Sequence, residues 1–162
     1  MKFINDLLES IGLGKDKNNL DAHEECEYQA YLAKIYSILK TENNSNTPTT
    51  LLVNLEDSIP LIKKYPFLSY RAWQDLCEIY GKEKFAMDIY KARIDTFIDG
   101  RYFLELCAAN YTLVLPNYHL GYLGEKPMET LHILSEVGFS RGELSEVFHS
   151  KVSKIELVKT DK

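Results

Sequence analysis

The sequence predicts a mainly α protein: a single-domain, multi-helix bundle of antiparallel hairpins, with room for a minor two-stranded β element near the C-terminus. Three observations predict this fold. Apolar residues recur at intervals of three and four over most of the chain, as on one face of a helix. Glycine or proline separates the periodic stretches. The 162 residues, 45% hydrophobic and 27% charged, have the size and composition of one globular domain, here residues 1–162.

In the first half of the chain, residues 20–40 form the longest predicted helix. Acidic residues crowd its first turns and lysines follow later, the order that the helix dipole favours. A polar stretch at about 41–50 is predicted to be a flexible loop. Residues 49–65 favour two short helices interrupted at Pro60, because proline breaks a helix interior. A further helix over 70–80 is predicted to end at Gly81 and to place Trp73 near the middle of the core.

Two periodic stretches follow, over 83–99 and 101–114. The first is predicted to be a helix that ends at Gly100. The second begins with helical spacing, but its end, residues 112–115, fits a helix and a strand equally well.

The last third of the chain has clear helix boundaries. Pro127 and Gly138 mark the start and end of one predicted helix, and Ser140 caps another that runs to about Lys151. The C-terminal tail, about 152–162, alternates like a strand over 154–159. This segment either pairs with residues 112–115 or frays, because a lone strand needs a partner.

Charge and cysteine content limit the compartment and the classes of partner. The net charge of −5 repels nucleic acid phosphates and selects basic partners. The three cysteines are scattered and form no paired motif, which indicates a reducing, cytoplasmic environment. Asp6 and Glu9 interrupt the apolar face of residues 1–13, and no apolar run reaches the roughly 18 residues of a membrane span. We therefore expect a cytoplasmic protein with no membrane partner.

No pattern of catalytic residues is present, so we expect a protein that is not an enzyme and needs no cofactor. Two Glu-x-x-His pairs, Glu129…His132 and Glu146…His149, have the ligand spacing of di-iron helix bundles. Such a site needs two further glutamates on separate long helices, whereas these pairs lie on short consecutive ones. We therefore predict no metal ligands, and a metal-dependent enzyme remains the second alternative.

Residues 129–151 offer another reading. The segment from Ile133 to Leu144, with Gly138 at the turn and Ser140 as a cap, is similar to helix-turn-helix sequences over about twenty residues. This resemblance implies a DNA-binding regulator as the first alternative. Leu134 is bulky where such motifs have a small residue, and Glu143 and Glu146 would face the phosphates. An ordinary helical hairpin is the competing interpretation.

Two surfaces are predicted to bind a protein partner. One is an acidic cluster in the first turns of the 20–40 helix, for which the competing interpretation is a solvated face. The other is the loop 116–124, whose aromatic residues are either exposed anchors or folded back to cap the core. The predicted partner-binding residues are Asp21, Glu24, Glu25 and Glu27 in the cluster and Tyr118, His119 and Tyr122 in the loop.

These surfaces lead to one functional hypothesis: an immunity protein or antitoxin that neutralises a basic, nuclease-type toxin. The active site of a nuclease is built to attract phosphates, so an acidic protein with tyrosine anchors can imitate that charge and block the site. The eleven tyrosines of the chain supply large rings with a polar tip.

Overall fold

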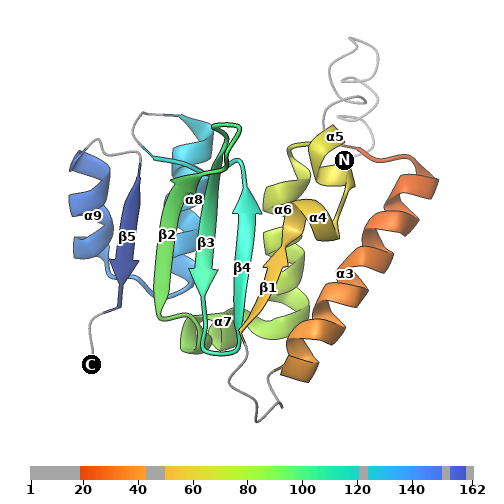
Figure 1. The fold of residues 1–162 in the computed structure, drawn as a ribbon, viewed down its shortest axis with the longest axis horizontal. Coiled ribbons are helices and arrows are strands. Elements are labelled where there is room, and N and C mark those ends of the chain that lie inside the picture. Colours follow the sequence, from red (N-terminus) through yellow and green to blue (C-terminus); the bar gives the residue numbers. More distant parts are fainter. Residues whose placement is uncertain (1–18, 43–49, 121–123, 151–153, 160–162) are drawn as a thin grey trace, which may run out of the picture.

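The computed structural model describes residues 19–42, 50–120, 124–150 and 154–159, and its fold is mixed α/β (Figure 1). The helices and strands in chain order are α3 (Ala22–Glu42), β1 (Leu51–Asn54), α4 (Leu55–Ser58), α5 (Leu61–Lys64), α6 (Leu68–Leu76), the π-helical turn η1 (Cys77–Gly81), α7 (Lys82–Asp88), β2 (Lys91–Thr96), β3 (Tyr102–Cys107), β4 (Tyr111–Pro116), α8 (Glu125–Glu136), α9 (Arg141–Ser150) and β5 (Ile155–Val158).

The strands form one five-stranded sheet in the order β1-β4-β3-β2-β5. Strand β1 pairs with β4 in parallel, and the other neighbours are antiparallel. Helices α6, α7 and α8 lie behind the sheet in Figure 1, while α3 lies beside β1 and α9 beside β5. The prediction of a mainly α bundle of antiparallel hairpins is therefore wrong, as is the all-α classification.

The error lies between residues 89 and 116, where the predicted helices are strands. Helix α7 ends at Asp88, and β2, β3 and β4 follow as an antiparallel meander. Gly100 does not end a helix: with φ at 89° it forms the turn between β2 and β3. In β2 the residues alternate between polar and apolar, and such a short run fits the periods of two and 3.6 alike. Pairing with neighbouring strands decided between them.

Several local predictions are confirmed. Helices form over 22–42, 68–81, 125–136 and 141–150, and two short helices flank Pro60. Strand β1 precedes them and was not predicted. The C-terminal strand exists as β5, but it pairs with β2 rather than with residues 112–115. The minor two-stranded element is thus part of a larger sheet.

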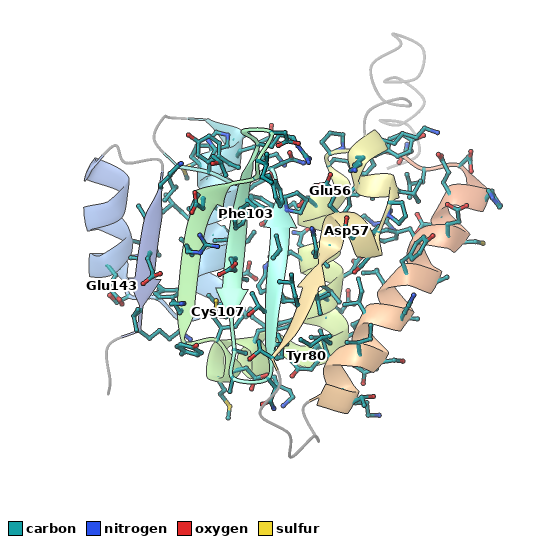
Figure 2. All side chains as sticks on the ribbon, in the orientation of Figure 1. Glu56, Asp57, Tyr80, Phe103, Cys107 and Glu143 are labelled. Atoms are coloured by element: carbon teal, nitrogen blue, oxygen red, sulfur yellow. The ribbon has the colours of Figure 1, made fainter. Side chains whose placement is uncertain are left out.

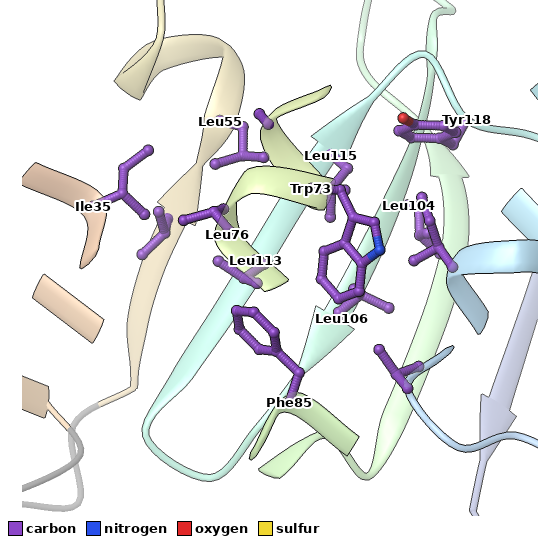
Figure 3. Close-up of a cluster of buried hydrophobic side chains, with 14 of the residues drawn as sticks. Ile35, Leu55, Trp73, Leu76, Phe85, Leu104, Leu106, Leu113, Leu115 and Tyr118 are labelled. Carbon is purple, nitrogen blue, oxygen red and sulfur yellow. The ribbon is translucent and has the colours of Figure 1, made fainter. Parts of the chain in front are cut away.

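The core lies between the sheet and the helices behind it (Figure 3). Trp73 of α6 is fully buried there among leucines of β3 and β4, and its ring packs against Phe85 of α7 at 5.1 Å between centroids. Its indole N–H donates to a carboxylate oxygen of Glu136 on α8 at 3.2 Å. This arrangement ties α6, α7 and α8 to one face of the sheet. Among the described helices, none is long and apolar enough to cross a bilayer.

Candidate functional site

The acidic cluster lies in the first turns of α3, where part of it caps the helix. The backbone N–H of Glu24 donates to the Asp21 carboxylate at 2.8 Å, and the N–H of Asp21 donates to the Glu24 carboxylate at 3.2 Å. This reciprocal pair satisfies two N–H groups that the helix leaves unpaired. Because the pair is local in sequence, the acidic start of the helix was predictable.

Glu24 has a second set of partners from a distant segment. Lys64 donates to its carboxylate at 3.0 Å, and the Tyr65 hydroxyl donates at 2.9 Å. The side chain is buried, with 9% of the residue exposed. The hydrogen bond from Lys64 is the main cause that lowers the pKa of Glu24 to about 2. This carboxylate holds α5 against the start of α3.

Glu25 is also bound within the fold. Its two carboxylate oxygens accept hydrogen bonds from the Arg71 guanidinium of α6 at 2.9 and 2.6 Å. The guanidinium also pairs with Asp75 at 3.4 Å and lies 4.4 Å from the ring centre of Tyr28. The hydroxyl of Tyr28 donates to Asp75 at 2.7 Å. The result is a network that joins α3 to α6.

The remaining acidic residues of the cluster are exposed. Within the described part of the chain, the Asp21 side chain accepts only the capping hydrogen bond from Glu24. Glu27 pairs with His23 on the same helix at 3.3 Å. The structure therefore divides the predicted cluster: Glu24 and Glu25 stabilise tertiary contacts, whereas Asp21 and Glu27 face the surface.

The aromatic residues described in the predicted loop, Tyr118 and His119, are not exposed anchors. Tyr118 is fully buried, in agreement with the alternative in which the loop caps the core. Its buried hydroxyl makes no hydrogen bond of good geometry with any described residue, although the Ser69 side chain lies beside it. His119 is half-buried against the Tyr102 ring at 5.1 Å, and burial lowers its pKa. Tyr122 lies outside the described residues.

A groove of about 650 Å³ runs between α3 and the helical segment formed by α6 and η1, which lie side by side in Figure 1. The floor is apolar, with Leu32 and Tyr36 on α3 and Ile79 on η1. Ile79 is 45% exposed although it is aliphatic. The described residues that line the groove are Gln29, Leu32, Ala33 and Tyr36 on one side, and Arg71, Asp75, Glu78 and Ile79 on the other.

The rim of this groove is acidic. Asp75 and Glu78 outnumber Arg71, whose guanidinium is already paired with Glu25 and Asp75. Glu78 is exposed and makes no ion pair with any described residue. Glu78 and Ile79, which are both exposed, lie in the π-helical turn η1, and such turns are frequent at functional sites. Sequence reasoning missed these residues.

A second groove, of about 530 Å³, lies between α8 and α9. Met128, Leu131 and Leu144 make it apolar, and Arg141 is its charged residue without an ion pair among the described residues. The hairpin has the expected turn, with Gly138 at a φ of 101°, and the expected cap, in which Ser140 and Glu143 exchange hydrogen bonds.

The Glu-x-x-His pairs do not converge where they are described. Glu129 binds Lys126 at 3.1 Å, and His132 contacts Glu136 at 3.4 Å. The side chains of Glu146 and His149 lie outside the described part. No cluster of three or more potential metal ligands occurs among the described residues.

The face of the sheet opposite the helices carries charges that neutralise one another. Arg93 of β2 pairs with Asp95 at 2.6 Å and with Glu105 of β3 at 3.0 Å. Phe103 and Cys107 lie on the same strand, β3 (Figure 2), and the Phe103 ring packs beneath the Arg93 guanidinium at 5.4 Å. Lys154 also pairs with Asp95 at 3.6 Å, and Lys91 pairs with Glu156 at 4.0 Å, so three cations balance three carboxylates in the ion pairs described on this face.

Comparison with known proteins finds no match among family models, curated proteins or solved structures.

Proposed function

We propose that the protein acts by binding a basic protein partner through the α3–α6 groove, without catalysis of its own. The single observation that supports this proposal is the combination of an exposed carboxylate, Glu78, with exposed apolar surface at Ile79. A charge without an internal partner attracts a cation, and an apolar floor beside it gives the contact a desolvated centre.

The concrete form that we propose is an immunity protein or antitoxin that neutralises a nuclease-type toxin. Such a partner carries lysines and arginines that attract phosphate. A small protein of net charge −5 is drawn to them at long range, and association is then fast and sensitive to salt. The groove supplies the short-range contacts.

We place this activity in the cytoplasm. The three cysteines, Cys26, Cys77 and Cys107, are all unpaired, and Cys26 is exposed. An exposed free thiol is typical of a reducing compartment. We assign no function to the Cys26 thiol itself.

The alternative of a DNA-binding regulator rests on the α8–α9 hairpin. Its turn and cap suit such a motif, but carboxylates outnumber basic residues over 125–150, which weakens contact with phosphates. A gel-shift experiment with genomic fragments at two salt concentrations separates the two functions: we expect no shifted band at either concentration.

Affinity capture from the native cells with three forms of the protein tests the proposal. We expect wild type and Glu83→Lys to retain the same basic protein and Glu78→Lys to retain at least about tenfold less of it. Glu83 is a matched control because it is exposed and lies outside the groove. Equal capture by all three forms, or capture of no basic protein, would contradict the proposal. If the partner is a nuclease, addition of the wild-type protein should inhibit it.

A further inference from the structure

The two walls of the α3–α6 groove are single stripes on two helices. On α3 the lining residues are Gln29, Leu32, Ala33 and Tyr36, which recur at intervals of three, one and three. On α6 and η1 they are Arg71, Asp75, Glu78 and Ile79, with similar spacing. Residues with this spacing lie on one face of a helix. The groove is thus the seam between two helices, the place where a third helix packs in many helical layers.

The dimensions of the groove suit a short helix. At a rise of 1.5 Å per residue, the lining stretch of either wall is about 10–12 Å long, or roughly two helical turns. Ala33 is exposed and small, so the backbone of an added helix can come close to α3 at this position. Leu32, which is almost fully buried, and Tyr36 contribute apolar surface to the groove on the same helix.

The charges specify which face of that helix carries which residues. The titratable side chains that line the groove are Arg71, Asp75, Tyr36 and Glu78. Arg71 and Asp75 pair with each other and with Glu25 and Tyr28, and the ring centre of Tyr36 lies 6.0 Å from Lys40 Nζ. Glu78 has no ion pair among the described residues. An occupant therefore meets one available negative charge next to the apolar surface of Ile79 and Tyr36. Lysine or arginine one turn from an apolar residue matches both.

We infer that the segment that occupies the groove is an amphipathic α-helix of the partner, two to three turns long, with apolar residues toward Leu32, Tyr36 and Ile79 and a basic residue against Glu78. This inference rests on the proposed function and specifies the form of the partner segment. It corresponds to the helix-in-groove mode of recognition, in which anchors recur at intervals of three and four residues.

The test uses the full chain and three synthetic peptides of about 14 residues, a length of roughly four helical turns. The first combines leucine and lysine so that the leucines form one helical face. The second has the same sequence with D-amino acids at two central positions, which breaks the helix without a change in composition. The third has glutamate in place of every lysine. Binding is measured by calorimetry, and the site is mapped by the amide chemical shifts of the labelled protein.

We expect the helical leucine–lysine peptide to shift amides within 29–36 and 71–79 and to bind at least about tenfold more tightly than either other peptide. Glu78→Lys should weaken this binding at least about tenfold, and Glu83→Lys less than about twofold. Equal binding of the D-amino-acid peptide would overturn the helical occupant and leave a basic partner intact. Equal binding of the glutamate peptide, shifts confined to other surfaces, or no effect of Glu78→Lys would overturn the proposed function as well.

Discussion

The structure uses the carboxylates at the start of α3 and the carboxylate of Glu78 in the α3–α6 groove differently. At the start of α3, Glu24 and Glu25 are bound by Lys64, Tyr65 and Arg71. Further along the α3–α6 groove, Glu78 is exposed and has no ion pair among the described residues. Glu24 and Glu25 therefore serve the fold, whereas the charge of Glu78 is available at the surface.

This difference shows that the density of acidic residues is a poor guide to available charge. A carboxylate attracts a partner only if no internal cation neutralises it, and an ion pair inside the protein removes that opportunity. Substitutions at the start of α3 and in the groove test whether the carboxylates of these two regions differ in this way.

The largest change in stability is expected when α6, which contacts both the start of α3 and the groove, loses its anchor in the core. Helix α6 carries Arg71 and Asp75, and Trp73 fixes it to the sheet. Trp73→Ala removes a fully buried ring and should lower the free energy of unfolding by about 3–5 kcal/mol. Met87→Ala, at a residue that is 85% exposed, should change it by less than about 0.5 kcal/mol. Chemical denaturation measures both, and similar losses would show that Trp73 is not central to the core.

Charge reversal should separate the two groups directly. Glu24→Lys removes the acceptor of Tyr65 and sets a second cation beside Lys64, so we expect the midpoint of thermal unfolding to fall by more than about 4 °C. Glu78→Lys should leave the midpoint within about 1 °C, because its side chain is exposed and makes no ion pair with the residues that the structure describes. Differential scanning calorimetry of the two variants provides the measurement. A comparable fall for both would mean that Glu78 also belongs to the fold.

Arg71→Met should convert bound carboxylates into available ones. The substitution keeps much of the side-chain volume over Tyr28 but frees Glu25 and Asp75. We expect a loss of about 1 kcal/mol in the free energy of unfolding, because the guanidinium is partly exposed. Affinity for the leucine–lysine peptide should rise by about threefold. A fall in affinity would show that Arg71 contacts the occupant itself.

The smallest effect concerns pH. The folded pKa of Glu24 is about 2, below its ordinary value of 4.5, chiefly because Lys64 donates to the carboxylate. Its ionised form therefore stabilises the folded state fully above about pH 4.5, and this contribution is lost as the pH falls toward 2. Thermal midpoints between pH 6 and about 2 should fall less steeply for Glu24→Gln than for wild type. Parallel curves would rule out Glu24 as a source of acid sensitivity.

Local sequence patterns predicted the helices well and the sheet poorly. The boundaries of α9 and of α8 depend on Ser140 and Gly138, whose effects come from bonds within three or four residues. The parallel pairing of β1 with β4 joins Leu51 to Tyr111, and no pattern near Leu51 reports that partner. Apolar residues are so frequent in 101–114 that the segment fits both the helical and the strand period. Its conformation as strands β3 and β4 therefore depended on hydrogen bonding between the strands.

For the candidate site the limit was similar. The acidic cluster was visible in the sequence, but Lys64 and Arg71, which neutralise it, lie 40 and 46 residues away from Glu24 and Glu25. No sequence pattern marked Glu78 and Ile79 as site residues, because a glutamate next to an isoleucine is common in helices. Their exposure in the π-helical turn beside α3 is a property of the folded structure.

Local sequence patterns were enough to predict that α3, α6, α8 and α9 form near their observed positions, because helical hydrogen bonds connect near neighbours. The three-dimensional fold was needed to show that β2, β3 and β4 are strands and that Glu24 and Glu25 are bound while Glu78 is available. The physical reason is that a strand and an ion pair each need a partner, and in this chain those partners come from distant segments.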